Sequence, residues 1–238
     1  MEEIFKLENV SVVRKNGAIL KNISLEIHKG DFITIIGPSG SGKSTFLRIL
    51  STLNSPSSGR ILYKGKDIME YDKLDFRKKV RYVFQKPYLF GDTVMENIEF
   101  PFAINHQSID IERVYKMMGA LDLPKDFLDK KNYQLSGGEQ QRIAFIRSLI
   151  IRPEVLLLDE VTASLDPVNV KRVEEFISIY ARDEDITVLI VTHDIAQAER
   201  WGEETLYLKK GQIEHFLPTN QLFTEYKSEI EKFRQGEE

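Results

Sequence analysis

Apolar and polar positions alternate along the first part of the chain, a pattern that predicts β structure. Residues 5–36 are expected to be β structure, with alternation at Phe5 and Leu7 and, after a turn near Asn16 and Gly17, at residues 23–27. Residues 32–36 are instead a short apolar run, which predicts a buried parallel strand. Further strand candidates are residues 59–63, 80–84, 155–158 and 186–191. The last two are nearly uninterrupted apolar runs, which are typical of strands covered on both faces. Residues 168–182 lie between these two runs and have a helical pattern, which predicts a βαβ crossover.

Apolar residues three or four positions apart predict helices in two other regions. Between residues 86 and 152 two such sets indicate an inserted helical subdomain: Val114, Met117 and Met118, then Ile143, Ile146, Leu149 and Ile150. Near the end of the chain the set is Leu222, Tyr226, Ile230 and Phe233. This last set predicts one amphipathic C-terminal helix that packs its apolar face on the core.

The composition is that of a soluble globular protein, because 42% of the 238 residues are hydrophobic and 29% are charged. A net charge of −4 gives no basic surface for nucleic acid, so we expect no nucleic-acid partner. The chain contains no cysteine, which excludes disulfides and thiolate metal sites and suits a reducing cytoplasm. We find neither a signal peptide nor a stretch approaching the ~20 apolar residues of a membrane span, so any membrane role is expected to come through a partner.

A glycine-rich segment joins the strand predicted before residue 37 to a helical pattern. It fits the phosphate-binding pattern G-x-x-x-x-G-K-[S/T] and comprises Gly37, Pro38, Ser39, Gly40, Ser41, Gly42, Lys43, Ser44 and Thr45. Glycines let backbone N–H groups approach phosphates, and the helix N-terminus adds partial positive charge. We expect Lys43 to reach the β- and γ-phosphates and the Ser44 hydroxyl to ligate Mg²⁺. A chance glycine-rich turn is the alternative, and the flanking strand and helix disfavour it.

Two adjacent carboxylates, Asp159 and Glu160, end the apolar run of residues 155–158. A phosphate loop alone leaves the reaction open, since kinases, GTPases and ATPases share it. In the crevice beside the loop Asp159 would hold Mg²⁺ and Glu160 would polarise the attacking water as a general base. The alternative is that these two residues are ordinary solvated acids after a strand. The presence of the phosphate loop disfavours this alternative.

The segment LSGGEQQR at residues 135–142 resembles the signature motif of ATP-binding cassette (ABC) ATPases. Its residues Ser136, Gly137, Gly138 and Glu139 would start a helix and form a second anion-binding N-terminus. In the resembled family the signature of one protomer closes over the ATP on the phosphate loop of another. The resemblance therefore implies an ATP-dependent, head-to-tail homodimer.

Three further positions match the family by resemblance. Gln85 matches the Q-loop glutamine, which contacts Mg²⁺ or water and reports the nucleotide state to a membrane partner. Asp166, in the segment Ser164, Leu165 and Asp166, matches the D-loop that crosses the dimer interface. His193 matches the switch histidine that contacts the γ-phosphate.

One position departs from the family pattern. Where the family usually has an aromatic ring to stack on adenine, the closest residue here is Arg14. A guanidinium can also stack on a base, so we expect Arg14 to contribute to ATP binding, with less apolar area buried.

The resemblance implies an α/β fold, a P-loop NTPase of ABC type with a mixed-sheet core, an N-terminal antiparallel β subdomain and an inserted helical subdomain. We expect residues 1–238 to form a single nucleotide-binding domain, with 1–85 and 153–238 as the catalytic core and 86–152 as the insertion. The implied activity is ATP hydrolysis with ATP and Mg²⁺ as cofactors. It would power a separate membrane permease from the cytoplasmic face of the membrane.

Residues 85–94 occupy the region that receives the permease in this family, and Tyr88, Leu89 and Phe90 are candidates for an exposed docking surface. The alternative is that Leu89 and Phe90 pack the inserted helices. Residues 89–94 and the single-cassette length also resemble the ATPase of a bacterial exporter implicated in iron homeostasis. A soluble ABC ATPase of cofactor assembly and the ATPase of a phosphate or amino-acid importer are the alternatives. A small-molecule phosphoryl transferase would have no use for the signature segment.

Overall fold

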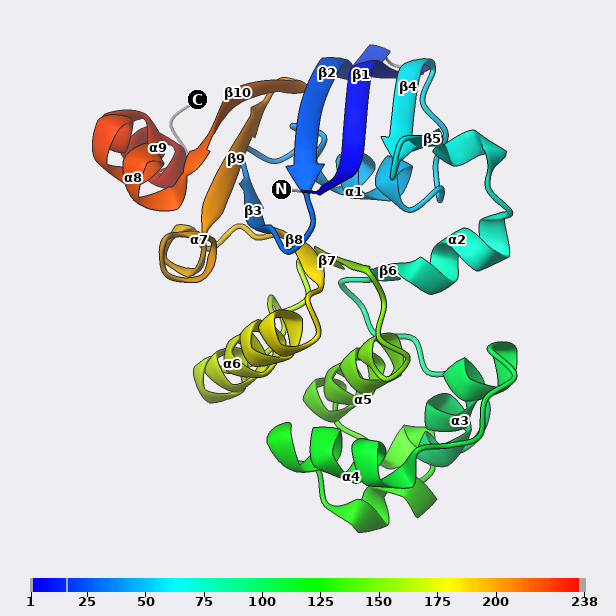
Figure 1. The fold of residues 1–238 in the computed structure, drawn as a ribbon. Helices are drawn as coiled ribbons and strands as arrows, with labels where there is room; N and C mark the ends of the chain where they lie inside the picture. The colour runs from blue at the N-terminus through cyan, green and yellow to red at the C-terminus, as the bar shows by residue number, and fades with distance from the viewer. Residues whose placement is uncertain (1, 16, 236–238) are drawn as a thin grey trace. The chain divides into compact units, whose positions relative to one another are not determined.

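A computed structural model describes residues 2–15 and 17–235 (Figure 1). The chain forms two compact units. The first comprises Met1–Tyr82, Glu154–Glu160 and Asp185–Glu238, and the second comprises Val83–Pro153 and Val161–Glu184. Of the predicted turn near Asn16 and Gly17, Asn16 lies outside the described residues.

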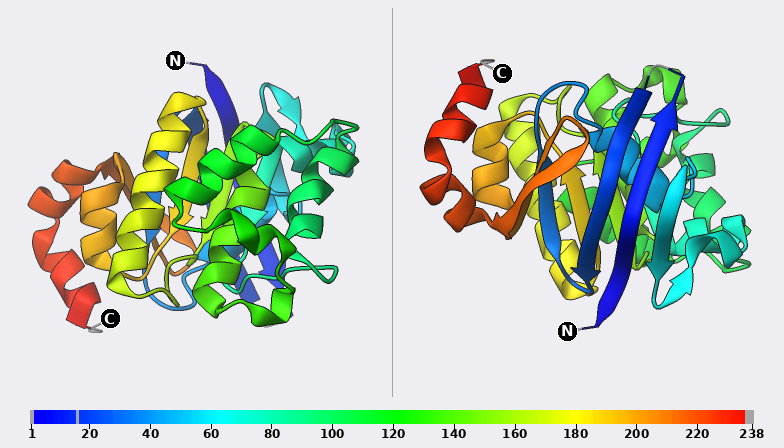
Figure 2. Two further views of the ribbon diagram at one scale, coloured as in Figure 1. Left: turned by 90° about the horizontal axis from the view of Figure 1, so that it is seen from below. Right: turned by 90° about the horizontal axis from the view of Figure 1, so that it is seen from above.

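The first unit contains an antiparallel sheet built from the N-terminal part of the chain. Its strand order is β2 (Gly17–His28), β1 (Glu3–Arg14), β4 (Ser58–Tyr63) and β5 (Lys66–Asp67). Figure 2 shows β1 and β2 side by side, with β4 on the other side of β1. Leu7 pairs with Leu25 on one side and Ile61 on the other, so alternate apolar side chains share one face. The predicted N-terminal β structure is confirmed.

The second sheet is mixed, as predicted. Its strand order is β10 (Gln212–Pro218), β9 (Glu204–Lys209), β3 (Phe32–Ile36), β8 (Thr187–Val191), β7 (Val155–Asp159) and β6 (Val80–Val83). β3 is parallel to β8 and β9, and β7 is parallel to β8, whereas β10 is antiparallel to β9. Every residue of β3, β7 and β8 is buried, which explains their uninterrupted apolar sequences. The sequence patterns did not predict β9 and β10.

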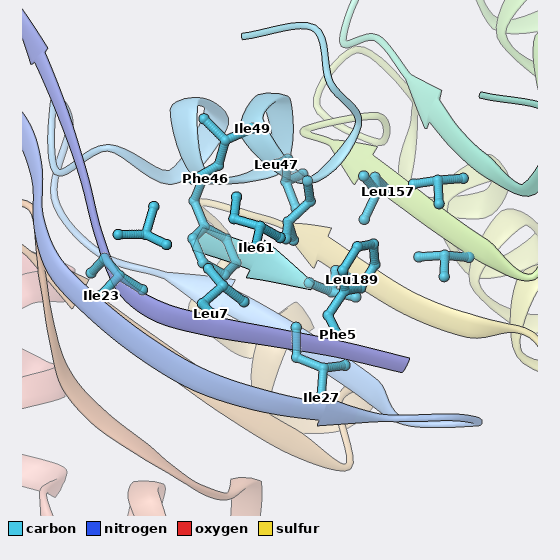
Figure 3. Packing of buried hydrophobic residues seen from close by; sticks show 14 of the residues in the cluster. Phe5, Leu7, Ile23, Ile27, Phe46, Leu47, Ile49, Ile61, Leu157 and Leu189 are labelled. Atoms are coloured by element: carbon cyan, nitrogen blue, oxygen red, sulfur yellow. The ribbon is translucent and has the colours of Figure 1, made fainter. Parts of the chain in front are cut away.

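Helix α1 (Lys43–Leu50) joins the two sheets into one hydrophobic core. Its Phe46 and Leu47 pack in the same cluster as Leu7 of the antiparallel sheet and Leu157 and Leu189 of the mixed sheet (Figure 3). All five side chains are almost fully buried, and each such side chain contributes about 1.5–3 kcal/mol through removal from water. This packing holds the start of α1 at the end of β3. Near this core, the first unit also has the short helices η1 (Ile68–Glu70) and α2 (Lys73–Lys79).

Three helices of the first unit, α7 (Ile195–Trp201), α8 (Thr219–Glu225) and α9 (Lys227–Gln235), share a second cluster with the mixed sheet. Leu222 and Ile230 are buried there, which confirms that the C-terminal apolar set packs on the core. The prediction of one continuous helix is wrong, because the helix is interrupted at Tyr226, where φ is −109° and ψ is 23°. The break places the Tyr226 ring 3.8 Å from the ring of His215 in β10.

The second unit is helical. It contains α3 (Val94–Ile104), α4 (Ile111–Ala120), η2 (Lys125–Asp129), η3 (Asn132–Gln134), α5 (Gly137–Leu149) and α6 (Pro167–Asp183). The apolar sets predicted to form helices lie buried on α4 and in and just after α5, as expected. Helix α6 matches the predicted helix 168–182 and groups with this unit. The subdomain boundaries at residues 85 and 153 stay a prediction. No helix among residues 2–15 and 17–235 has the length and apolar character needed to cross a membrane.

Candidate active site

The glycine-rich segment forms the turn between β3 and α1. Gly37 has a φ of +143°, and a Cβ atom there would lie 1.9 Å from the Leu208 carbonyl oxygen, so no other residue fits. Gly42 is the N-cap of α1 with a φ of 106°, and no side chain caps this helix end. The first N–H groups of α1 are therefore open to an anion.

Lys43 forms hydrogen bonds to the backbone of its own loop. Its Nζ donates hydrogen bonds to the carbonyl oxygens of Gly37, over 2.6 Å, and Pro38, over 2.8 Å. The side chain is buried. Burial lowers the pKa of the Lys43 ammonium, and the carboxylates of Glu160 and Asp159 oppose this shift. The loop is thus held by a cation that anionic phosphates would attract.

Asp159, the last residue of β7, is held by side chains from two other elements. The Ser44 hydroxyl donates to its Oδ1 over 2.8 Å, and the Tyr82 hydroxyl donates to its Oδ2 over 2.5 Å. Burial raises the pKa of Tyr82, and its bond to Asp159 does so further, which keeps the phenol protonated and able to donate. Arg48 Nη2 lies 3.9 Å from Asp159 Oδ2.

Glu160 and His193 form a second pair. His193 Nε2 lies 2.6 Å from Glu160 Oε1, a distance at which the imidazole N–H donates to the carboxylate. Glu160 has a φ of +52°, which is costly for a residue with a side chain, and its backbone N–H donates to the Val191 carbonyl. His193 follows β8, and Asp194 next to it caps α7. The ends of neighbouring parallel strands thus bring the two side chains together.

A cavity of about 380 Å³ joins the phosphate loop to this pair. Its walls are Ser39, Gly40, Gly42, Lys43, Ser44 and Thr45 of the loop, together with Ile19, Glu160 and His193. The volume is within the usual range for small-molecule sites. A phosphate group bound on the loop would therefore lie in the same cavity as a carboxylate and an imidazole.

In the second unit, Ser136 begins α5 with a reciprocal cap. Its hydroxyl accepts from the Glu139 N–H over 3.3 Å, and the Glu139 carboxylate accepts from the Ser136 N–H over 2.6 Å. Burial opposes ionisation of Glu139, but the hydrogen bonds with Ser136, together with the positive charges of Lys130 and Arg142, outweigh it and lower the pKa of this carboxyl group. Glu139 is thereby tied to the start of α5.

Asp166 belongs to the same unit. It caps α6 by accepting from the N–H groups of Val168 and Asn169, both at 3.1 Å. Arg142 of α5 donates to the Asn169 side chain. The middle of α5 is therefore bonded to the start of α6.

Comparison with known proteins identifies the family. The family profile described as "ABC transporter" matches residues 20–163, which is more than half of the chain. The chain belongs to the ABC transporter family. The sequence-based assignment of an ABC cassette fold is confirmed, and the chain is an ATP-binding subunit of this family and an ATP hydrolase.

Several relatives of this ABC cassette illustrate the family. The probable iron export ATP-binding protein FetA of Escherichia coli (strain K12) is 43% identical over 191 residues, covering 80% of this chain and 85% of that protein. The phosphate import ATP-binding protein PstB of Thermotoga maritima is 35% identical over 243 residues, covering 97% and 96%. The dimeric post-hydrolysis structure of the cassette MJ0796 with ADP and Pi has a TM-score of 0.81 at 33% identity, covering 91% and 99%.

The predicted site residues of the cassette divide between the two units. The phosphate loop, Asp159, Glu160 and His193 come together in the first unit. Gln85, which is exposed after β6, and residues 136–139 and 166 belong to the second unit. Their roles with nucleotide stay predictions.

Arg14 is exposed at the end of β1. Its guanidinium donates to the Val13 carbonyl over 3.3 Å, and Arg14 is not among the residues that line the phosphate-loop cavity, whereas Ile19 is. The role of Arg14 in holding adenine stays a prediction.

The predicted docking segment of the cassette, residues 85–94, contains both exposed and packed rings. Tyr88 is 74% exposed. Phe90 instead packs on Phe100, with ring centroids 4.4 Å apart, and lies under the guanidinium of Arg147 at 4.9 Å. The exposed ring fits the docking hypothesis, and the packed one fits the alternative for Phe90.

Three side chains near the site were missed from the sequence: Ile19, Arg48 and Tyr82. Arg48 could have been found, because it is four positions after Ser44 on α1 and so shares its face. Tyr82 and Ile19 carry no such signal, since only the pairing of strands brings them to the loop.

Proposed function

We propose that this ABC cassette hydrolyses ATP at the cavity between its phosphate loop and the Glu160–His193 pair, and so powers a separate membrane permease. The observation that carries the proposal is that the loop and this pair line the same cavity. The loop supplies binding of phosphates, and the pair supplies a base and its orienting partner.

ATP binding follows from the loop geometry. The open N–H groups at the start of α1 and the Lys43 ammonium would bind the phosphates, and Lys43 would exchange its bonds to Gly37 and Pro38 for phosphate oxygens. These groups also neutralise the negative charge that develops during hydrolysis.

The residues near Asp159 fit Mg²⁺. The Ser44 hydroxyl and an Asp159 carboxylate oxygen lie 2.8 Å apart at the loop, and Mg²⁺ prefers such oxygen ligands together with substrate phosphates. Ser44 and Asp159 are the residues of the first unit that would hold it. When bound, the ion would polarise the phosphate oxygens.

Glu160 is the proposed general base. Its carboxylate borders the cavity and can accept a proton from the attacking water. His193 orients this carboxylate through the 2.6 Å contact and is the group that would reach the γ-phosphate. Loss of either role should slow hydrolysis while ATP binding by the loop persists.

A second copy of the chain is proposed to complete the site. Residues 136–139 of one protomer would cover the ATP bound to the loop of the other, with Asp166 at the interface. The dimeric state described for the MJ0796 cassette with ADP and Pi supports this arrangement.

The permease is proposed to dock at residues 85–94, which would place the cassette peripherally on the cytoplasmic face of the cell membrane. Iron export is the proposed transport function, supported by 43% identity to FetA. Phosphate import is the second candidate, because the alignment with PstB covers 97% of this chain.

Purification of the tagged protein from native membranes tests the transport role. Co-purification of a multi-span membrane protein, identified by mass spectrometry, is expected, whereas a soluble assembly factor alone would contradict the proposal. Reconstitution of the complex in vesicles then distinguishes ATP-driven movement of iron from that of phosphate.

A further inference from the structure

Tyr82 and Asp159 lie on adjacent strands of the mixed sheet, β6 and β7. The Tyr82 hydroxyl donates to Asp159 Oδ2 over 2.5 Å, while the Ser44 hydroxyl donates to Oδ1 over 2.8 Å. Each carboxylate oxygen therefore has its own hydroxyl donor. Two donors on opposite oxygens fix the orientation of the carboxylate more firmly than one donor could.

Arg48 supports this arrangement from α1. Its Nε donates to the Tyr82 phenol oxygen at 3.4 Å, and its Nη2 lies 3.9 Å from Asp159 Oδ2. A phenol has one proton to donate, so a bond accepted from Arg48 leaves that proton for Asp159. The bonds thus run in one direction from Arg48 through Tyr82 to Asp159, and such chains reinforce one another.

We propose that Tyr82 is a positioning residue for Mg²⁺ binding. Its hydroxyl holds Oδ2 of Asp159 so that Oδ1 stays beside the Ser44 hydroxyl, the other oxygen proposed to hold the ion. This inference rests on the proposed Mg²⁺ role of Ser44 and Asp159. Partners that orient a metal ligand typically change metal affinity or activity about 10- to 100-fold. The effect of Arg48 is smaller, because its side chain is 45% exposed and its contacts are longer.

Tyr82→Phe isolates the hydroxyl. The Tyr82 ring is partly buried against the core of the first unit, and phenylalanine would keep that packing. Tyr71→Phe is a matched control, because the Tyr71 ring packs against the same core and its hydroxyl donates to the Tyr63 carbonyl over 3.0 Å. Each variant loses one hydrogen bond donated by a hydroxyl, and Tyr82→Phe also loses the bond accepted from Arg48, but only the bond donated by Tyr82 reaches Asp159.

Binding of a fluorescent ATP analogue to the full-length protein tests the proposal, first in EDTA and then during titration with MgCl₂. Tyr82→Phe is expected to raise the Mg²⁺ concentration at half-saturation roughly tenfold and to leave binding in EDTA unchanged. Tyr71→Phe should change neither quantity. A merely structural role for Tyr82 would lower the melting temperature without moving the half-saturation point. That result overturns the proposal.

Asp159→Asn separates this inference from the proposed function. If Asp159→Asn leaves the Mg²⁺ dependence intact, the proposed metal site and the role of Tyr82 both fail. If Asp159→Asn abolishes the dependence and Tyr82→Phe leaves the half-saturation point unmoved, only the role of Tyr82 fails. Should Tyr82→Phe not fold, Arg48→Met replaces it, with an expected increase of roughly two- to threefold. An unchanged value in that variant overturns the proposal.

Discussion

Ser44 and Asp159 are 115 positions apart in the chain, and the Ser44 hydroxyl donates a 2.8 Å hydrogen bond to Asp159 Oδ1. The pair forms because β3 leads into the loop before α1 and β7 ends at the same edge of the mixed sheet. This geometry places two oxygen atoms beside the phosphate loop, where the first prediction applies.

Ser44→Ala is expected to reduce Mg²⁺-dependent ATP hydrolysis by about tenfold or more, because one proposed oxygen ligand is removed. Ser44→Thr keeps the hydroxyl and serves as the control, with activity close to that of the wild type. Phosphate release measured over a range of MgCl₂ concentrations checks both. Equal activity of the two variants would contradict the proposed metal role of Ser44.

Glu160→Gln is expected to slow hydrolysis about 100-fold or more, since an amide cannot accept the proton of the attacking water. The variant should still bind ATP, because the loop is unchanged, and it should accumulate as an ATP-bound dimer. Phosphate release and size-exclusion chromatography with ATP measure the two effects. The same column run with ADP is the control. Full hydrolysis in this variant would remove Glu160 from the role of base.

Gly37→Ala is expected to destabilise the protein by more than about 3 kcal/mol, because the new Cβ would clash with the Leu208 carbonyl, 1.9 Å away. Gly65→Ala is the control. Gly65 also has a positive φ, +74°, but nothing lies within 4 Å of its Cβ position, so only about 1–2 kcal/mol of backbone strain is expected. Urea unfolding of both variants gives the comparison. If Gly37→Ala lowers the free energy of unfolding no more than Gly65→Ala does, the prediction is wrong, because the loop then accommodates the Cβ atom by moving.

Glu229→Gln is expected to make stability less sensitive to acid. Glu229 accepts from Lys209 at 3.1 Å and from His215 at 3.2 Å. Burial opposes its ionisation, but these bonds outweigh burial and hold the pKa of Glu229 below its ordinary value of 4.5. A carboxylate with a lowered pKa stabilises the folded state above the ordinary pKa and loses this effect as the pH falls through the lowered value.

The difference in unfolding free energy between wild type and Glu229→Gln should thus be largest near neutral pH and shrink below about pH 4.5. Denaturant unfolding over a pH series measures it. Glu231→Gln is the control, because Glu231 is exposed and its Lys227 contact is 3.9 Å long. A difference that grows on acidification would contradict the prediction.

Arg14→Ala is expected to weaken ATP binding several-fold if the guanidinium stacks on adenine, as the sequence predicts. Lys15→Ala, at the neighbouring exposed position, is the matched control for the loss of one positive charge. Calorimetry with ATP measures both affinities. Unchanged affinity in Arg14→Ala would show that other residues hold the adenine base. Ile19 in the cavity wall is the structural candidate.

Much of the fold could be predicted because the relevant patterns are local. β3, β7 and β8 are buried on both faces, so their apolar runs stand out in the sequence. β9 and β10 were missed. Polar residues interrupt the apolar pattern of β10, and its pairing with β9, rather than its own pattern, makes it a strand. The break at Tyr226 was missed because the apolar spacing continues through it.

The sequence by itself determined the family and the components of the site: the glycine-rich loop of residues 37–45, the acidic pair at 159–160 and the capped segment at 136–139. These are contiguous motifs whose spacing carries the chemistry. Only the tertiary structure decided which distant side chains meet, such as Tyr82 and Arg48 at Asp159 or Glu160 at His193. Such contacts depend on strand order and on the direction of each side chain at a strand end, and packing of the whole sheet sets both.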